Sequence, residues 1–272
     1  MEKELQMLNT KNCHLQLKTG GMDYIRFGKG RKNFIIVPGV GDGLKTVKGM
    51  AMPFALLYRR MAKDFTVYVF SRRTLLAPHT DTREMAADLN EAMDALGLSD
   101  ACVLGVSQGG MIAQWLAIDH PDKVERLVLA VTLARPNRTI RSVISRWSKM
   151  ASRRDYKAIM LDTANRSYSE KRRWKARILF GLLGNIGRPK SFERFLIQAG
   201  SCLTHRAYDE LPCITCPVLV IGGSDDRIVT GKASAEIADR IPGSRLYMYE
   251  GLGHGLYEEA PDFLDRVMDF CR

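Results

Sequence analysis

Short apolar runs alternate with helix-like stretches along most of this 272-residue sequence. The runs are continuous rather than interleaved with polar residues, which is typical of strands buried on both faces of a parallel sheet. Four of them lie in the first half of the chain: Phe34–Val37, Thr66–Phe70, Ala101–Val106 and Leu127–Val131. Because the stretches between them suit helices, the pattern predicts an α/β fold with a mostly parallel sheet flanked by helices.

The sheet is expected to start with a hairpin and to be completed near the end of the chain. Gly20-Gly21 separates the strand-like segments His14–Lys18 and Asp23–Phe27, which is typical of an antiparallel hairpin. Two further apolar runs, Val218–Gly222 and Arg245–Tyr249, follow much later. The sequence therefore predicts an eight-stranded, mostly parallel sheet.

Helical periodicity is found in the segments that connect these strands. After Asp81, apolar residues recur at spacings of four, four and three from Met85 to Leu96, and Asp81 can cap the helix that they indicate. Further helices are expected over 108–118, 231–241 and 257–271.

The strand–helix series is interrupted once, by polar, Arg-rich sequence that is compatible with helices and has no strand-like run. We expect residues 134–210 to form a helical insertion, and residues 1–133 and 211–272 to form one core around a single sheet. Five aromatic side chains of the insertion are expected to pack between its helices rather than to line a cavity: Trp147, Tyr156, Trp174, Phe180 and Phe195.

The net charge of +11 at pH 7 is concentrated in this insertion. Residues 134–210 contain 18 Lys and Arg against 6 Asp and Glu, whereas the rest of the chain contains 23 and 24. A basic patch attracts acidic substrates, nucleic acid or a membrane surface, but solvated helix faces give the same composition. The sequence leaves these interpretations open.

A single serine, Ser107, stands between an expected strand and an expected helix, in Gly105-Val-Ser-Gln-Gly109. A serine on such a tight turn needs small residues two positions before and after it, because the backbone there is strained. The turn exposes the hydroxyl, and the N-terminus of the following helix favours an oxyanion. The pattern predicts a nucleophile, with a plain strand-to-helix turn as the alternative.

A serine nucleophile needs a histidine to accept its proton. Four of the five histidines lie in the first strand, a loop, a helix end and the insertion: His14, His79, His120 and His205. The fifth, His254, lies between glycines directly after the last expected strand, at the sheet edge where Ser107 emerges. We therefore predict that His254 is the base.

The carboxylate that orients this histidine is expected in the loop after the strand Val218–Gly222. Asp225 and Asp226 both lie in that loop, where one of them would serve as a capping or turn residue. With either residue, the order along the chain is serine, aspartate, histidine.

These motifs resemble the α/β-hydrolase superfamily, and most closely its lactonase, esterase and cofactor-free haloperoxidase branch. The similarity extends from about residue 33 to residue 271 and is densest over 105–117, 120–129 and 253–261. The resemblance implies the α/β-hydrolase fold, with residues 134–210 as a helical cap over the substrate pocket.

The resemblance also assigns roles to individual residues. The acid of this family commonly stands in a G-x-x-D-x-x-V pattern, which Gly223–Val229 matches with Asp226 rather than Asp225. The implied catalytic triad is therefore Ser107, Asp226 and His254.

An oxyanion hole built from the backbone N–H groups of Val40 and Gln108 is implied as well. The family usually has His-Gly where this chain has Pro38-Gly39, so the hydrogen bonds by which that imidazole braces the loop must be replaced. A second difference is Ser71-Arg72-Arg73, in which Arg72 alone matches the family's Asp-x-Arg-Gly-like loop.

The activity implied by the resemblance is that of a serine hydrolase cleaving a small carboxylic ester or lactone through an acyl-enzyme, without a cofactor or metal ion. An Arg-rich cap favours an anionic or polar acyl group, unless its arginines face away from the pocket. Two alternatives are a C–C bond hydrolase or other acyl-transfer enzyme on the same triad, and a hydrolase-derived ligand receptor with little turnover.

The first residues lack the apolar core of a signal peptide, and no apolar run approaches the ~18 residues of a membrane span. We expect a cytoplasmic monomer or homodimer that acts on a small molecule and not on nucleic acid. Its six cysteines form no evident disulfide framework, which suits a reducing compartment. Cys213-Ile-Thr-Cys216 is a lone CxxC, which we expect at the entry to a strand rather than at a metal or redox site.

Overall fold

The computed structural model describes residues 8–184 and 186–272. Residues 1–7, at the start of the segment in which no signal peptide is expected, lie outside the described residues. Within the described ranges, no helix is long and apolar enough to cross a membrane.

Eight strands form one open sheet in the order β1-β2-β4-β3-β5-β6-β7-β8. The strands are β1 (Lys11–Leu17), β2 (Gly20–Phe27), β3 (Lys32–Val37), β4 (Phe65–Arg73), β5 (Ala101–Val106), β6 (Val124–Ala130), β7 (Val218–Gly223) and β8 (Arg245–Tyr249). Strand β2 pairs antiparallel with β1 and β4, and all other neighbours are parallel. The predicted eight-stranded, mostly parallel sheet and its opening hairpin are confirmed.

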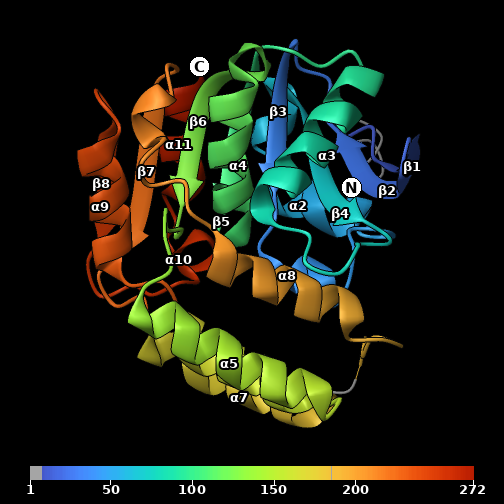
Figure 1. Ribbon diagram of the computed structural model, residues 1–272, viewed down its shortest axis with the longest axis vertical. Coiled ribbons are helices and arrows are strands. Elements are labelled where there is room, and N and C mark those ends of the chain that lie inside the picture. The colour runs from blue at the N-terminus through green and yellow to red at the C-terminus, as the bar shows by residue number, and fades with distance from the viewer. Residues whose placement is uncertain (1–7, 185) are drawn as a thin grey trace.

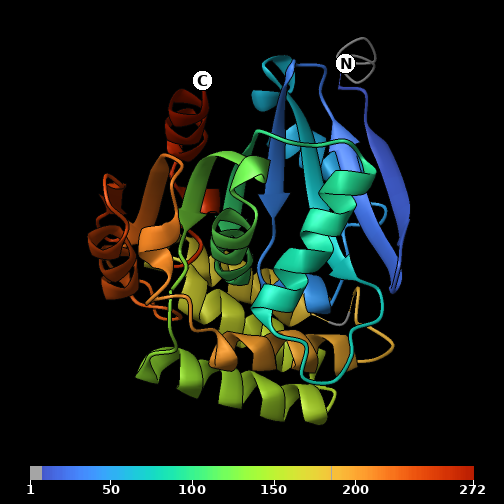
Figure 2. The same cartoon turned by 45° about the horizontal axis from the view of Figure 1, so that its top comes forward.

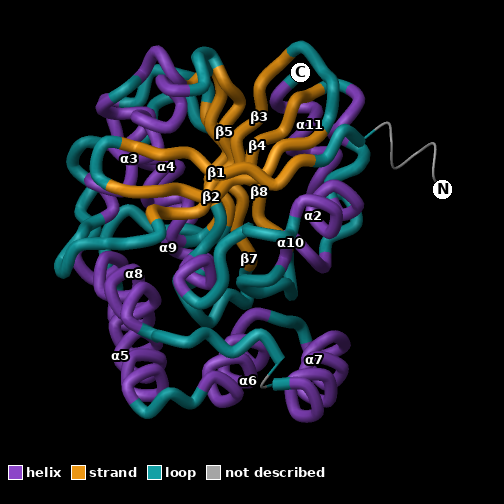
Figure 3. Tube along the Cα trace, turned by 90° about the vertical axis from the view of Figure 1, so that its right-hand side faces the viewer, coloured by secondary structure: helices purple, strands orange, loops and turns teal. Residues whose placement is uncertain are grey.

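Helices cover both faces of this sheet, which explains why its central strands are apolar throughout. Every residue of β5 and β7 is buried. Figure 3 shows helices α3 (Thr82–Ala95), α4 (Gln108–Asp119) and α9 (Gly231–Arg240) on one face, with α2 (Ala51–Leu57) and α11 (Phe263–Cys271) on the other. Each face has its own hydrophobic core.

The helices of the core follow the sequence pattern with two differences. Asp81 caps α3 in a reciprocal capping box with Glu84, as its position predicts. The single helix expected over 257–271 is wrong, because the chain forms α10 (Leu256–Glu259) and α11 on either side of Pro261, which cannot donate a helical hydrogen bond. The short helix α2 was not predicted.

Four helices form the insertion between β6 and β7: α5 (Arg138–Ser152), α6 (Tyr156–Ser167), α7 (Glu170–Leu183) and α8 (Glu193–Thr204). Figures 1 and 2 show them beyond the carboxyl ends of the parallel strands. This is the edge of an open α/β sheet at which ligands bind.

The aromatic residues of the insertion differ in their surroundings. Trp147, Tyr156 and Phe195 are buried in a core shared by α5, α6 and α8, as expected. The prediction that none of them lines a cavity is wrong for Trp147, which also lines a cavity at the carboxyl ends of the strands. The prediction for Trp174 is wrong, because 57% of this residue is exposed on α7. The side chain of Phe180 lies outside the described part of the chain.

The CxxC segment lies at the entry to a strand. Cys213 ends a short 3-10 turn, Leu211–Cys213, and Cys216 comes two residues before β7. Both thiols are free, as are those of the other four cysteines.

Candidate active site

Ser107 occupies a strained turn between β5 and α4. Its backbone angles, φ 56° and ψ −121°, are rarely adopted by a non-glycine residue. The turn is fixed on both sides, because Ser107 N–H donates to Ala130 O (2.9 Å) and Thr132 Oγ1 donates to Ser107 O (2.7 Å). Gly109 has to be small, because a Cβ there would lie 1.9 Å from the carbonyl oxygen of Val37.

His254 and Asp226 meet on the loops that follow β8 and β7. The imidazole Nδ1 donates to Asp226 Oδ2 over 2.8 Å, and both side chains are buried. The other carboxylate oxygen, Oδ1, accepts the N–H groups of Ile228 (2.7 Å) and Val229 (2.9 Å). Burial alone raises the pKa of Asp226, but the attraction to His254 and these hydrogen bonds lower it on balance. The carboxylate is thereby held ionised.

Asp225 and the other histidines lie elsewhere. Asp225 is exposed and accepts a hydrogen bond from Ser224 Oγ (3.1 Å). Two histidines have other partners, His14 with Asp23 on the first hairpin and His205 with a buried threonine and glutamine. Of the described histidines, only His254 is among the residues that line the cavity beside Ser107.

Ser107 and His254 line one cavity of about 320 Å³. Among the described residues, Ser107 Oγ makes no hydrogen bond to the imidazole; in free enzymes such contacts are often long and tighten when substrate binds. Most of the remaining wall is apolar and comes from both sides of the cleft: Val47, Met50, Phe54, Trp147, Ile228 and Tyr257.

The charged lining of the cavity does not come from the Arg-rich insertion. The insertion contributes Trp147, Thr163 and Ser167, and none of its described lysines or arginines lines the cavity. Lys45, from the loop after β3, is the cation that does. Within the described part of the chain, no group of three or more His, Cys, Asp or Glu is arranged to hold a metal ion.

Two backbone N–H groups lie beside the serine without acceptors. A Cβ built on Gly39 would lie 3.3 Å from Ser107 Cβ, so the loop after β3 passes directly by the serine. The N–H groups of Val40, in this loop, and of Gln108, at the start of α4, donate to no described group. Both are therefore available to an oxyanion formed at Ser107.

Arg72 braces this loop, at the place where the resemblance to the family implied an imidazole. Its buried guanidinium donates to Pro38 O and to the side-chain oxygen of Gln108 (3.1 Å). Burial lowers the pKa of Arg72 to about 10, although Asp42 opposes the shift, so the side chain stays charged at neutral pH. One side chain thus supports the segments that carry both free N–H groups.

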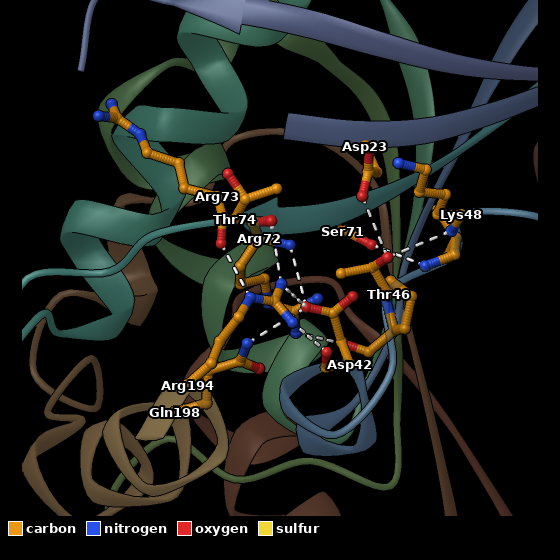
Figure 4. Close-up of polar contacts among 12 residues, drawn as sticks. Asp23, Asp42, Thr46, Lys48, Ser71, Arg72, Arg73, Thr74, Arg194 and Gln198 are labelled. Carbon is orange, nitrogen blue, oxygen red and sulfur yellow. Dashed lines mark hydrogen bonds and ion pairs between the residues drawn. The ribbon is translucent and has the colours of Figure 1, made fainter. Parts of the chain in front are cut away.

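The insertion reaches the same loop through Arg194 and Gln198 of α8 (Figure 4). The guanidinium of Arg194 donates to the backbone oxygen and the carboxylate of Asp42, to Arg73 O (2.9 Å) and to Arg72 O (3.0 Å). Gln198 Nε2 donates to the same carboxylate (3.2 Å). These contacts could not be predicted from the sequence, because residues so far apart in the chain form no local pattern.

The insertion also contacts the loop that carries His254. Ser167, at the end of α6, accepts the N–H of Gly255 (2.8 Å), and a Cβ on Gly253 would lie 2.7 Å from the same oxygen. One residue further on, Tyr168 OH donates to Glu258 Oε2 (2.8 Å). The joint between α6 and α7 is therefore packed directly against the histidine loop.

The comparisons with known proteins agree with this architecture. A family model described as alpha/beta hydrolase fold matches residues 33–261. A protein of Caulobacter sp. (strain K31) named "Putative carbamate hydrolase RutD" is 30% identical over 205 residues, which are 74% of this chain and 75% of that protein.

Solved structures resemble the whole chain at low identity. The enol-lactonase from Burkholderia xenovorans LB400 has a TM-score of 0.81 at 20% identity, covering 95% of this chain and 99% of its own. An esterase from Exiguobacterium antarcticum has a TM-score of 0.76 at 19% identity, covering 96% and 99%. At this identity the likeness shows the fold alone. The family itself is shown by the match over residues 33–261, and the chain therefore belongs to the α/β-hydrolase family.

Proposed function

We propose that the chain is a serine hydrolase that cleaves a small carboxylic ester or lactone through Ser107, His254 and Asp226. The observation that carries this proposal is a buried His254–Asp226 pair whose imidazole lines the same cavity as a serine on a strained strand-to-helix turn. Three loops from distant parts of the chain supply these groups at one sheet edge, which is the arrangement that nucleophilic acyl transfer requires.

In the proposed reaction, His254 Nε2 accepts the proton of Ser107 while Oγ attacks the acyl carbon. Asp226 fixes the tautomer by accepting from Nδ1, and its lowered pKa keeps it ionised as the imidazolium forms. His254 then donates the proton to the leaving alcohol. Water attacks the acyl-enzyme by the same route and releases the acid.

The oxyanion of each tetrahedral intermediate accepts the N–H groups of Val40 and Gln108. This assignment is supported by the position of both N–H groups beside Ser107 and by their having no other acceptor among the described residues. Donors held in place before the reaction need no reorganisation as charge develops, and each is worth about 3 kcal/mol in enzymes of this kind.

The cavity favours a small acyl group without a negative charge. Its wall is mostly apolar, and among its described lining residues Lys45 would attract an anion whereas Asp42 would repel one. The arginines of the insertion, which favoured an anionic substrate at the level of sequence, do not line it. Residues 134–210 still act as a cap in this proposal, since Trp147, Thr163 and Ser167 line the cavity, while residues 1–133 and 211–272 form the catalytic core.

The proposal is tested with an activated ester, nitrophenyl acetate, and a fluorophosphonate probe. The variant Ser107→Ala should lose activity at least a thousandfold and should not be labelled, whereas exposed Ser142→Ala should behave as the wild type. Label on a serine other than Ser107, or turnover retained in Ser107→Ala, would refute the assignment. A wild-type protein that binds an ester but neither labels nor turns over would be a ligand receptor.

A carbamate is the second candidate substrate, because the Caulobacter relative is named as a carbamate hydrolase. The proposed triad can attack a carbamate carbonyl in the same way. Purified protein assayed with matched neutral esters, anionic esters, lactones, carbamates and a C–C cleavable diketone separates these reactions by their kcat/KM. A preference for anionic over neutral esters would contradict the proposal that the acyl group carries no negative charge.

A further inference from the structure

The charge of the insertion is not used by the active site. Residues 134–210 contain 18 basic and 6 acidic residues, yet none of the described basic residues lines the cavity. Residues 170–190 contain seven Lys and Arg and one acidic residue, and five of the seven basic residues fall within residues 171–177. This segment includes α7, which Figures 1 and 3 place at the end of the molecule far from the sheet.

The same segment exposes large apolar side chains. Nine large hydrophobic residues are markedly exposed in the described chain, and four of them fall within thirteen residues: Trp174 (57%), Ile178 (53%), Leu179 (51%) and Ile186 (70%). Such a concentration is not the scatter that an ordinary protein surface shows, and it indicates a contact surface.

Helical spacing brings the apolar and basic groups together on one side of α7. Trp174 and Ile178 are four residues apart, as are Lys175 and Leu179, so the two pairs form adjacent rows. Lys171 begins the second row. Lys171 and Lys175 are exposed and form no ion pair with a described residue, and α7 packs through the opposite side, where Ala176 is buried.

We propose that this face of α7, with Ile186 after it, docks on the surface of an anionic phospholipid membrane. A basic helix with an exposed Trp, Ile and Leu stripe is the composition of an interfacial helix, in which the apolar side chains enter the acyl boundary and the lysines contact the headgroups. Trp174 is the residue type that prefers this boundary.

The charge also argues against other occupants of this face. A second copy of the chain would bring two strongly basic insertions together, and like charges oppose such a contact. Nucleic acid would use the lysines, but its phosphates make no use of exposed Ile178, Leu179 and Ile186. Acyl chains and anionic headgroups together satisfy both parts of the face.

Tryptophan fluorescence of the full chain tests the proposal directly. Trp174 is exposed, whereas Trp115 and Trp147 are 5% and 3% exposed, so an environment change at the surface reports on Trp174. Adding vesicles of equimolar phosphatidylcholine and phosphatidylglycerol should shift the emission to shorter wavelength. Pure phosphatidylcholine vesicles should give a much smaller shift, and added salt should weaken the binding.

Two pairs of variants separate the contributions in vesicle co-sedimentation. Ile178→Ser with Leu179→Ser, and Lys171→Glu with Lys175→Glu, should each weaken binding to the anionic vesicles about tenfold or more. Leu75→Ser, 80% exposed on the core, and exposed Lys63→Glu are the matched controls and should bind as the wild type. Ester hydrolysis in the absence of vesicles should be unchanged in every variant.

The proposal is overturned if the wild type does not bind anionic vesicles at low salt, or if both pairs of variants bind as tightly as the controls. It is equally overturned if the wild type is a dimer that dissociates when Ile178 and Leu179 are replaced. Salt-sensitive binding to duplex DNA in a gel shift, without vesicle binding, would assign the basic segment to nucleic acid instead.

Discussion

Replacing Arg194 by alanine tests whether the insertion holds the loop of Val40, the proposed oxyanion donor, in position. The substitution removes the ion-pair partner of the Asp42 carboxylate, whose side chain is 1% exposed, although the charge of Arg72 still attracts it. It also removes the donor to the backbone oxygens of Asp42, Arg72 and Arg73. Breaking a buried ion pair from one side costs about 3–5 kcal/mol, and since Arg194 is partly solvated we expect about 3 kcal/mol of unfolding free energy.

Catalysis should suffer separately from stability. The loop that carries Val40 is held by Arg72 and Arg194, and a displacement of about 1 Å at a reacting group costs up to about a hundredfold in rate. We expect kcat for nitrophenyl acetate to fall roughly tenfold or more, with little change in KM, because the oxyanion forms only in the transition state. A merely structural role would lower stability without this change in kcat.

The assay is urea unfolding followed by circular dichroism, together with steady-state kinetics below the unfolding range. Arg206→Ala is the matched control, since among the described residues its guanidinium donates only to the nearby backbone oxygens of Leu203 and His205. Adding Asp42→Asn to Arg194→Ala should recover part of the lost stability, because it removes the orphaned charge. A loss below about 1 kcal/mol, or one equal to that of the control, would refute the reasoning.

Three further predictions concern single sites. Burial lowers the pKa of His205 to about 3, so as pH falls below about 6.5 the unfolded chain binds a proton at this imidazole and the folded chain does not. Between pH 7 and pH 5 this difference should lower the free energy of unfolding by about 2 kcal/mol, and the variant His205→Gln should not show that loss in urea titrations. Gly109→Ala would press a methyl group against the end of β3 and should lower the melting temperature by several degrees, while Gly200→Ala, with open space around it, should not. Asp226→Asn should lower kcat by about ten thousandfold with the fold retained, and Asp225→Asn should leave it near the wild-type value; the opposite result would exchange their roles.

The sheet could be predicted from the sequence because a strand that is buried on both faces is expected to be a continuous apolar run. Ala101–Val106 and Val218–Gly222 are continuous apolar runs, and the structure buries all of β5 and β7. The turn at Ser107 could be predicted as well, because the close approach of α4 to β3 leaves room only for glycine at position 109. Each of these constraints falls on a few consecutive residues, so a short pattern records it.

The supports of the loop after β3 could not be predicted in this way. Arg72 stood out only as a residue retained without its usual partners, and nothing near it indicated Arg194 or Gln198. The contacts of Arg194 and Gln198 with this loop join positions 121 to 156 residues apart. An arginine that braces a loop has the same local sequence as one that faces solvent. For the same reason, the basic composition of the insertion could not show whether its arginines line the cavity or face away from it.

The hydrogen bond from the N–H of Gly255 to the backbone oxygen of Ser167 joins the part of the insertion that lines the cavity to the loop that carries His254. Replacing this helical insertion by that of another hydrolase would therefore change the position of the His254 imidazole as well as the shape of the cavity. Chimeras that preserve the backbone path at the end of α6, which supplies the accepting carbonyl oxygen, and glycines at positions 253 and 255 should keep turnover while exchanging specificity. Chimeras that ignore this joint should fold and yet be inactive.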